Sequence, residues 1–313
     1  MKTVYGLQQK KSLKSKICRE FGQNKYLYLL SVPIFLYFII FCYGPMFGLV
    51  IAFKQYEIGS GILHSKWVGL RYFKEFFQGI YFARTMKNTL IISFYDLIFG
   101  FPLPIIFALL LNEIQSGAFK KSVQTITYLP HFVSMVVICG IIVDFFGTDG
   151  VVTKMLTLFG MENKNYVGSS GAFRSIYVIT NIWQELGWNS IIYFAALTGV
   201  DACLYEAATI DGAGKFRQVI SITIPSILPT IMTMLILRIG QLLSVGYEKI
   251  ILLYSSATYD VADVIASYVY RMGVASNRFS YSAAVGLFQS VVNIVLLFIA
   301  NRFSKSATDT SLF

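Results

Sequence analysis

Residues 204–230 read LYEAATIDGAGKFRQVISITIPSILPT, and their polar side chains interrupt a chain that is otherwise mostly apolar. Just before this stretch, Asp201 is a good N-cap for a helix over CLYEAATI, which has strong helix formers in its middle. Gly212 and Gly214 should end that helix, and a second short helix is expected from Lys215 onward. The sequence therefore predicts a compact helix–turn–helix knob between two hydrophobic segments.

The composition indicates what surrounds this knob. Of the 313 residues, 56% are hydrophobic and 13% are charged, whereas ordinary soluble domains carry about 25% charged residues. The chain is therefore expected to be an integral membrane protein. Its formal net charge of +10 is assigned to loops and orientation rather than to nucleic-acid binding, because no stretch combines aromatic and basic residues as a nucleic-acid platform would. Neither the four cysteines nor the two histidines have the spacing of a metal site.

Six segments are long and apolar enough to cross a bilayer, which takes about 20 residues of helix. They are residues 27–53, 89–111, 126–146, 176–200, 219–245 and 282–301. Prolines at positions 33, 45, 102 and 104 suggest kinks, which are tolerable where neighbouring helices satisfy the freed carbonyls. We therefore expect an all-α membrane protein with a transmembrane domain over residues 27–302, in which residues 201–225 form a loop. A C-terminal tail is expected over residues 303–313.

The N-terminal residues 1–26 form a polar, basic tail rather than a cleavable signal peptide, because the apolar run after them is as long as a full span. Seven basic residues in this tail flank the first span. The first helix usually dominates orientation, so both termini and the knob are expected on the cytoplasmic side. On the other side, Trp67, Leu70, Phe73, Phe76 and Phe77 recur at helical spacing, which predicts a helix lying in the outer membrane interface.

The opening stretch resembles the EAA loop of ABC-importer permease subunits, whose pattern is EAA, two residues, DGA, and an Ile-x-Leu-Pro ending. The matching positions are Glu206, Ala207, Ala208, Asp211, Gly212, Ala213, Ile222 and Pro225. Ile224 stands where leucine is commonest in the family. Stretches such as YGPMFGLVIAFKQY, FGFPLPIIFALLLNE, GWNSIIYFAALTGVD and YSAAVGLFQSVVN resemble the branch of sugar permeases that import oligosaccharides or polysaccharide fragments.

This resemblance implies a bacterial inner-membrane permease of the maltose-importer type, with six helices and a cytoplasmic coupling helix. The coupling residues would be Glu206, Ala207, Ala208, Asp211, Gly212 and Ala213. The implied partners are a second, similar permease in a heterodimer, two ATP-binding subunits and an extracytoplasmic solute-binding protein that delivers the saccharide. ATP and Mg²⁺ are expected on the partner, because Thr209 and Phe216 stand where a phosphate-binding loop around Gly214-Lys215 needs glycine and Ser or Thr. The chain is thus expected to be a transport subunit and not an enzyme.

The fourth span, the most polar of the six, is the candidate lining of a substrate path. Asn181, Gln184, Glu185 and Trp188 fall at i, i+3, i+4 and i+7, on one helix face. Amides and carboxylates bind sugar hydroxyls, aromatic rings stack on sugars, and intramembrane polar residues usually face a cavity. On the fifth span, Arg238 and Gln241 share a face by the same spacing rule. Bonds between helices within the protein are the alternative role for all six residues.

Two further expectations concern charge. Glu185 and Arg238, on adjacent spans, are expected to pair with each other at rest, with Arg238 freed to meet a uronate when one is present. Asp96 and Asp144 also lie in spans and receive no role. The competing function is an ion-coupled secondary transporter that uses Asp96, Asp144 and Glu185 as a relay. The absence of an internal repeat argues against that function, and it leaves the EAA pattern unexplained.

Overall fold

The computed structural model describes residues 24–308, 311 and 312, so the basic tail predicted over residues 1–26 lies almost wholly outside the described residues. Within the described part, five helical segments are long and apolar enough to cross a membrane. They are Lys25–Phe53, Phe82–Glu113, Met135–Leu158, Lys215–Ile239 and Phe279–Ser306. A sixth span is formed by α11 (Ser170–Thr198), which joins α12 (Ala202–Ile210) across a bend of 70°. The predicted spans are all present in order, with different bounds.

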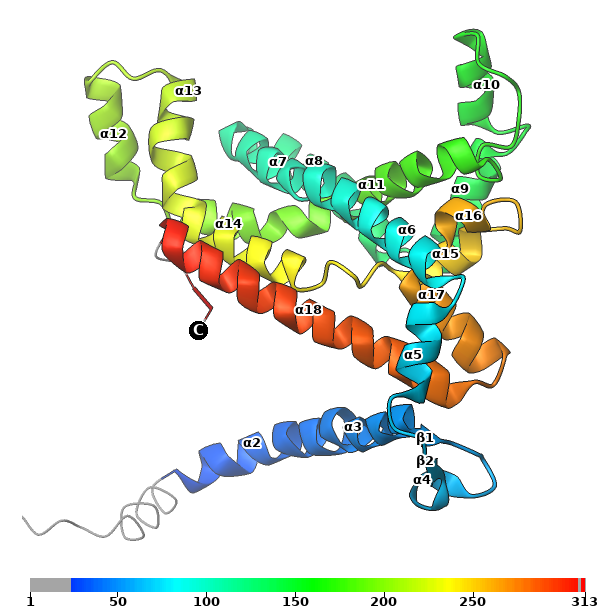
Figure 1. Cartoon of the computed structure of the whole chain (residues 1–313). Coiled ribbons are helices and arrows are strands. Elements are labelled where there is room, and N and C mark those ends of the chain that lie inside the picture. The colour runs from blue at the N-terminus through cyan, green and yellow to red at the C-terminus, as the bar shows by residue number, and fades with distance from the viewer. Residues whose placement is uncertain (1–23, 309–310, 313) are drawn as a thin grey trace, which may run out of the picture.

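The first span runs from α2 (Lys25–Tyr37) through a π-helical turn (Phe38–Tyr43) and α3 (Gly44–Met46) to a 3-10 helix (Phe47–Phe53). It therefore continues past the Gly-Pro pair instead of ending there. No residue of α2 is buried, and Figure 1 shows α2 at the bottom of the view, separated from the other helices. The far end of this span, the 3-10 helix, packs against α18 (Phe279–Thr308).

The second span is bent where its prolines predicted a kink. It consists of α6 (Phe82–Tyr95), a π-helical turn (Asp96–Gly100) and α7 (Pro102–Glu113). Pro102 begins α7, the helix position at which a missing N–H is not needed for an intrahelical bond. The π-helical turn directly before it places Asp96 on the inner side of the bundle, where it becomes part of the site described below.

The predicted third span, residues 126–146, is wrong as one continuous helix. α8 (Gly117–Tyr128) ends there, a 3-10 turn (Leu129–Phe132) contains Pro130, and α9 (Met135–Phe146) begins after Ser134. Proline cannot donate an interior helical bond, and the Ser134 hydroxyl accepts from the Val137 N–H at 3.4 Å as an N-cap. The membrane-length segment therefore starts at α9 and continues into α10 (Val151–Leu158).

The fifth span begins with α13 (Lys215–Gln218), passes through a π-helical turn (Val219–Thr223) and ends with α14 (Ile224–Ile239). It therefore ends six residues before the predicted boundary at position 245. From Gly240 the chain turns, and the Ser244 N–H donates to the Gln241 carbonyl at 2.8 Å. A Cβ on Gly240 would lie 2.7 Å from a methyl of Leu297, so glycine permits the close approach of α18 at this turn.

The helix predicted in the outer interface is shorter than expected and is partly buried in protein. β1 (Lys54–Gln55) pairs antiparallel with β2 (Lys66–Trp67), and α4 (Gly61–His64) lies between them. α5 (Arg71–Gln78) begins only after these strands, so Trp67 and Leu70 are not part of the helix. Its Phe76 is buried in a cluster with Leu243, Ile265, Tyr268, Tyr281 and Val285. Protein contacts therefore cover part of the apolar stripe that was assigned to the membrane surface.

Between the fifth and sixth spans lie three short helices, α15 (Tyr247–Leu253), α16 (Tyr259–Ala262) and α17 (Ile265–Tyr270), followed by a π-helical turn (Arg271–Ala275). α15 packs against α9, and its Ile250 is fully buried in the cluster that also holds Cys139 of α9 and Tyr177 of α11. α18 then completes the bundle and runs on to Thr308, into the predicted tail. In Figure 1, α15–α17 lie at the end of the molecule opposite to α12 and α13.

Candidate functional site

The predicted knob is formed by α12 and α13, which project together at one end of the molecule (Figure 1). The Asp201 side chain caps α12 by accepting from the Cys203 N–H at 2.9 Å. At the other end, the Gly212 N–H donates to the Thr209 carbonyl at 3.1 Å and the Ala213 N–H donates to the Ala208 carbonyl at 2.8 Å. These two bonds form a Schellman motif, so α12 ends by local chemistry that its own sequence supplies.

The two glycines of the knob have different roles. Gly212 has φ +76°, in the left-handed region that favours glycine. Gly214 has φ −67° and precedes α13 in extended backbone. A Cβ at either position would meet nothing within 4 Å. Space is therefore open at both glycines, and only Gly212 is required by its backbone conformation.

Side-chain bonds that the sequence did not indicate tie α12 to the start of the fifth span. The amide of Gln218, a buried residue, donates to the Thr209 hydroxyl at 3.0 Å and to the Ala213 carbonyl at 2.9 Å. The Tyr205 and Thr223 hydroxyls lie 3.0 Å apart. Gln218 was identifiable only as a polar residue directly before an apolar run. The bonds make the knob and the first turns of the fifth span one connected unit.

The knob also exposes large apolar side chains. Ile210 of α12 is 87% exposed, and Phe216 of α13 is 79% exposed. Glu206, Ala207, Asp211 and Gly212 of the EAA pattern are exposed as well, whereas Ala208 and Ala213 are half-buried. Exposed apolar surface rimmed by polar groups is typical of a protein interaction site.

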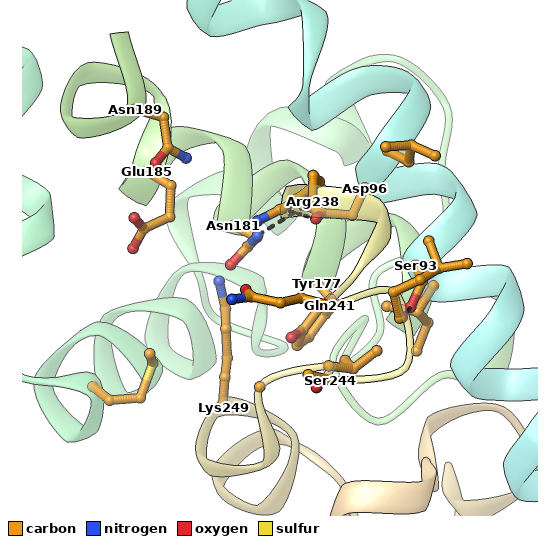
Figure 2. A pocket seen from close by; sticks show the side chains of 16 residues that line it. Ser93, Asp96, Tyr177, Asn181, Glu185, Asn189, Arg238, Gln241, Ser244 and Lys249 are labelled. Atoms are coloured by element: carbon orange, nitrogen blue, oxygen red, sulfur yellow. Dashed lines mark hydrogen bonds and ion pairs between the residues drawn. The ribbon is translucent and has the colours of Figure 1, made fainter. Parts of the chain in front are cut away.

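The second part of the site is a cavity of about 250 Å³ that lies between the second, fourth and fifth spans and α15. Figure 2 shows side chains from these four elements converging on it. Its polar lining consists of Ser93, Asp96, Tyr177, Asn181, Glu185, Asn189, Arg238, Gln241, Ser244 and Lys249. Four of the six predicted substrate residues are in this set, and they are Asn181, Glu185, Arg238 and Gln241.

The other two predicted residues lie outside the cavity lining. Gln184 is 3% exposed and packs within the bundle, where its Oε1 has no hydrogen-bond partner among the described residues. Trp188 is 42% exposed and stacks on His131, with ring centroids 4.4 Å apart. The wall that α11 gives to the cavity follows one row at i+4 spacing, namely Tyr177, Asn181, Glu185 and Asn189. Of the four residues on the predicted face, Asn181 and Glu185 therefore line the cavity, and Gln184 and Trp188 do not.

The centre of the cavity is an ion pair between Asp96 and Arg238. Asn181 Nδ2 also donates to Asp96 Oδ1 at 2.9 Å, so three spans meet at this carboxylate. Figure 2 marks both contacts. The predicted pairing of Arg238 with Glu185 is therefore wrong, because the π-helical turn before Pro102 brings Asp96 to the guanidinium first. Asp144, the other unassigned aspartate, is exposed at the end of α9.

Glu185 has a different partner, since its Oε2 lies 3.0 Å from His131 Nδ1. The same imidazole stacks on Trp188, in a plane only 3° from that of the indole. His131 stands in the 3-10 turn that interrupts the predicted third span, so the break in that span positions the ring. The cluster combines an aromatic face with a carboxylate at the edge of the cavity, and both groups remain partly exposed.

Lys249 is a charged lining residue that sequence reasoning missed, and Ser93, Tyr177, Asn189 and Ser244 were not predicted either. Lys249 lies on α15, between the fifth and sixth spans, and it is 1% exposed. Its Nζ has no hydrogen-bond partner among the described residues and lies 5.3 Å from the centroid of the Tyr177 ring. Burial lowers the pKa of the Lys249 ammonium to about 8. A lysine leading into the apolar run IILL was the only signal in the sequence.

Comparisons with known proteins agree with this architecture. Residues 100–309 match the family described as binding-protein-dependent transport system inner membrane component. Protein LplB of Bacillus subtilis is 46% identical over 93% of this chain and 92% of its own length. The polygalacturonan/rhamnogalacturonan transport system permease protein YteP of the same organism is 42% identical, covering 97% of this chain and 95% of the relative.

Solved structures give the same result at the level of the fold. A chain of a bacterial ABC transporter involved in the import of the acidic polysaccharide alginate superposes with a TM-score of 0.85 and 41% identity. The match covers 94% of this chain and 99% of that one. A second structure of a bacterial alginate ABC transporter, in complex with an alginate pentasaccharide-bound periplasmic protein, matches with the same score, identity and coverage.

Proposed function

This chain belongs to the family of binding-protein-dependent transport system inner membrane components, and on that premise we propose that it moves an oligosaccharide or polysaccharide fragment through its polar cavity. It is a multi-pass inner-membrane permease subunit of an ABC importer, and its family role is transport rather than catalysis. The relatives named for polygalacturonan/rhamnogalacturonan and for alginate support a saccharide cargo. The competing ion-coupled transporter is set aside, because the family is that of ABC importers and Asp144 does not line the cavity with Asp96 and Glu185.

The observation that carries the proposal is the lining of the cavity. Amides, carboxylates, hydroxyls and two cations from four separate elements converge on one space inside an otherwise apolar bundle. Polar groups at membrane depth are expensive and usually face a substrate path. Sugar hydroxyls can both donate and accept, so they suit a mixed lining of this kind. The His131–Trp188 stack at its edge adds an aromatic surface on which a sugar ring can pack.

We further propose that the knob couples this cavity to ATP hydrolysis on a partner subunit. Glu206, Ala207, Ala208, Asp211, Gly212 and Ala213 would form the surface that enters a cleft of the ATPase. The exposed Ile210 and Phe216 support a docked partner, since they would otherwise leave apolar surface in water. ATP and Mg²⁺ would bind the partner and not this chain. Orientation follows from the proposal, with the knob and both termini in the cytoplasm.

The proposed movement uses the connections of α12. The helix joins α11 through residues 199–201 and joins α14 through α13 and the Gln218 bonds. α11 and the end of the fifth span form two walls of the cavity. When two ATPase subunits close, each would draw one knob with it and tilt both walls. The cavity would then open to the other side of the membrane.

The remaining proposed partners complete the transporter. A second, similar permease would provide the other half of the pore in a heterodimer, and its contact with this chain would cover the exposed residues of the first span. Two ATP-binding subunits would hold the two knobs. An extracytoplasmic solute-binding protein would deliver the saccharide. The solved alginate transporter in complex with a pentasaccharide-bound periplasmic protein supports a partner of this kind.

The test is transport by the full importer, purified with the subunits that accompany this chain and reconstituted into vesicles. We expect ATP-dependent uptake of a labelled acidic trisaccharide or of its neutral counterpart. Glu185→Gln should reduce uptake about 10-fold or more, because it removes a cavity carboxylate whose hydrogen bond to a sugar contributes about 1.5–3 kcal/mol. Trp188→Ala should reduce uptake by less, because this indole lies outside the cavity lining and acts through its stack on His131. Trp183→Ala is the matched control, since Trp183 is an exposed indole of the same helix outside the cavity.

Three outcomes would count against the proposal. Uptake that follows a proton gradient without ATP would contradict the importer mechanism. Failure to transport or bind either trisaccharide would contradict the saccharide cargo. Unchanged uptake by both Trp188→Ala and Glu185→Gln, with assembly intact, would assign these two residues to packing.

A further inference from the structure

The charged side chains that line the cavity each contact a polar or charged partner, with one exception. Two carboxylates, Asp96 and Glu185, and two cations, Arg238 and Lys249, line it among the described residues. Asp96 is paired with Arg238 and also accepts from Asn181. Glu185 is held by His131 from outside the cavity lining. Within this described part of the molecule, Lys249 is thus the cavity cation without a paired anion.

The burial of Lys249 makes an unpaired ammonium unfavourable for the stability of the protein. The residue is 1% exposed, and its Nζ has no hydrogen-bond acceptor among the described residues. The ring of Tyr177, 5.3 Å away, offers only a cation–π contact. A buried ammonium normally needs a counter-charge and hydrogen-bond acceptors. An apolar side chain at position 249 would fill this space at a lower cost in folding free energy. The lysine is therefore better explained by an anionic ligand that enters the cavity.

The surroundings of the ammonium are those of a sugar site. Figure 2 shows Lys249 projecting into the same cavity as the Asn181 and Gln241 amides. Amides can donate to and accept from ring hydroxyls, and a primary ammonium can donate up to three hydrogen bonds to a carboxylate. At about 250 Å³, the cavity is slightly smaller than the range for small-molecule sites, about 300–1,000 Å³. It therefore suits a short segment of a saccharide rather than a long chain.

We propose that Lys249 binds the carboxylate of an acidic saccharide in the cavity and sets the preference of the permease for acidic over neutral sugars. The inference rests on the proposed function and deepens it by naming the class of saccharide. Without Lys249, two carboxylates would face a single, already paired guanidinium, and a uronate would be repelled. With Lys249, the incoming carboxylate meets a free cation. Arg238 does not take this role, because Asp96 already engages it.

The experiment measures binding to the detergent-purified full importer without ATP, by calorimetric titration. The probes are trigalacturonate and its fully methyl-esterified form, which has the same rings and no charge. Lys249→Met should weaken trigalacturonate binding about 10- to 100-fold, the range for loss of a hydrogen bond between charged groups. Binding of the ester should change by no more than about 3-fold. Lys154→Met, at an exposed position of α10, is the matched control and should leave both affinities unchanged.

Thermal unfolding of the same samples separates a binding role from a structural one. An apolar side chain in place of a buried, unpaired ammonium should leave the melting temperature unchanged or higher. A lower melting temperature with equal loss of both ligands would overturn the inference, as would equal binding of trigalacturonate by Lys249→Met and wild type. Wild-type binding of the ester alone would overturn it too, while leaving the saccharide function intact. Binding of neither probe by the wild type would instead contradict the proposed function itself.

Discussion

The knob and the cavity are built from contacts of very different range. In the knob, Asp201 caps a residue two positions away, Gln218 bonds a residue nine positions away, and Tyr205 meets Thr223 across 18 positions. In the cavity, Asn181 and Asp96 are 85 positions apart, and Arg238 and Asp96 are 142 apart. The knob is thus specified within one stretch of sequence, whereas the cavity exists only when four elements pack correctly.

This difference predicts how substitutions should act. A change in the knob should alter the coupling of two processes while leaving the bundle folded, because the knob projects from the core and is held by its own bonds. A change in the cavity should affect stability and transport together, because the residues that line it also hold the spans to one another. Four substitutions test this contrast, and their expected effects decrease from Asp96→Asn through Gly212→Val and Gln218→Leu to Glu206→Ala.

The largest effect is expected for Asp96→Asn, which removes the carboxylate that joins three spans. Arg238 would keep its charge without a counter-ion, and the loss of a charged hydrogen bond costs about 1.5–3 kcal/mol. Thermal unfolding of the purified importer should shift downward, and uptake should fall at least about 10-fold. Asp144→Asn is the matched control at an exposed aspartate, where a change within about 0.5 kcal/mol is expected.

A double variant sharpens the test of the ion pair. Asp96→Asn with Arg238→Gln removes both charges, so part of the stability lost in the single variant should return. If Asp96→Asn were as stable as Asp144→Asn, the pair would not hold the spans together, and the proposed contrast between cavity and knob would fail.

The next effect is expected for Gly212→Val in the knob. Valine would have to adopt the left-handed backbone, which costs about 1–2 kcal/mol for a residue with a Cβ. The end of α12 should rearrange, so ATP hydrolysis by the importer should continue while saccharide uptake per ATP falls several-fold. Gly214→Val is the matched control, because its side chain also enters open space but its φ of −67° suits valine.

Steric crowding within this chain is excluded as the cause at Gly212, since a Cβ there meets nothing within 4 Å. Equal coupling in Gly212→Val and Gly214→Val would show that the Schellman ending of α12 does not matter for transport. A loss of assembly in Gly212→Val alone would show that the knob is not independent of the bundle.

A smaller effect is expected for Gln218→Leu, which removes the amide's hydrogen bonds to Thr209 of α12 and to Ala213 of the following turn but leaves the Tyr205–Thr223 contact in place. Each such bond contributes about 1 kcal/mol, and water can replace part of the loss at the knob surface. Uptake per ATP should fall about 2- to 5-fold, with binding of saccharide to the cavity unchanged. Thr209→Val removes only one of the two acceptors, so its effect should lie between wild type and Gln218→Leu.

The smallest effect on folding is expected for Glu206→Ala. Glu206 is exposed and has no ion pair among the described residues, so unfolding should change by no more than about 0.5 kcal/mol. The association of the ATPase should nevertheless weaken, which a titration of purified ATPase against this chain's complex can measure. Asp149→Ala is the matched control, since it removes an exposed carboxylate from a part of the chain outside the knob. Undiminished association in Glu206→Ala would remove this carboxylate from the proposed interface.

Features held by contacts close in sequence were predictable, and features held by distant contacts were not. The Asp201 cap, the Gly212 turn and the second short helix were predictable, because each depends on residues only a few positions apart. The order of the spans was also predictable from their apolar length. The break at Pro130–Ser134 was missed for two reasons. Proline is common in packed membrane helices, and a serine such as Ser134 starts a new helix only where the packing around it favours a break. No local signal distinguished these possibilities.

The cavity was predicted only in part, for a physical reason. Helical spacing limits which residues of α11 share a face, so Asn181 and Glu185 were identified. Spacing does not reveal which other element approaches that face, so Arg238 was paired with Glu185 although Asp96 is its partner. Lys249 was missed because α15 reaches the cavity through packing against α9, a contact between segments more than 100 positions apart. Which side chains pair across more than 100 sequence positions is decided by how the helices pack.

Across the bend of 70°, the short helix α12 of the knob is joined to the much longer helix α11. The 29 residues of α11 correspond to a rod of about 44 Å, and Asn181 lies about 26 Å along it from the bend. A tilt of about 5° at the bend would move Asn181 by about 2 Å, on the rise of about 1.5 Å per residue used for that distance. Such a displacement is enough to break the 2.9 Å bond from Asn181 to Asp96. If the knob rotates as proposed, a small rotation there would make or break one hydrogen bond inside the bundle.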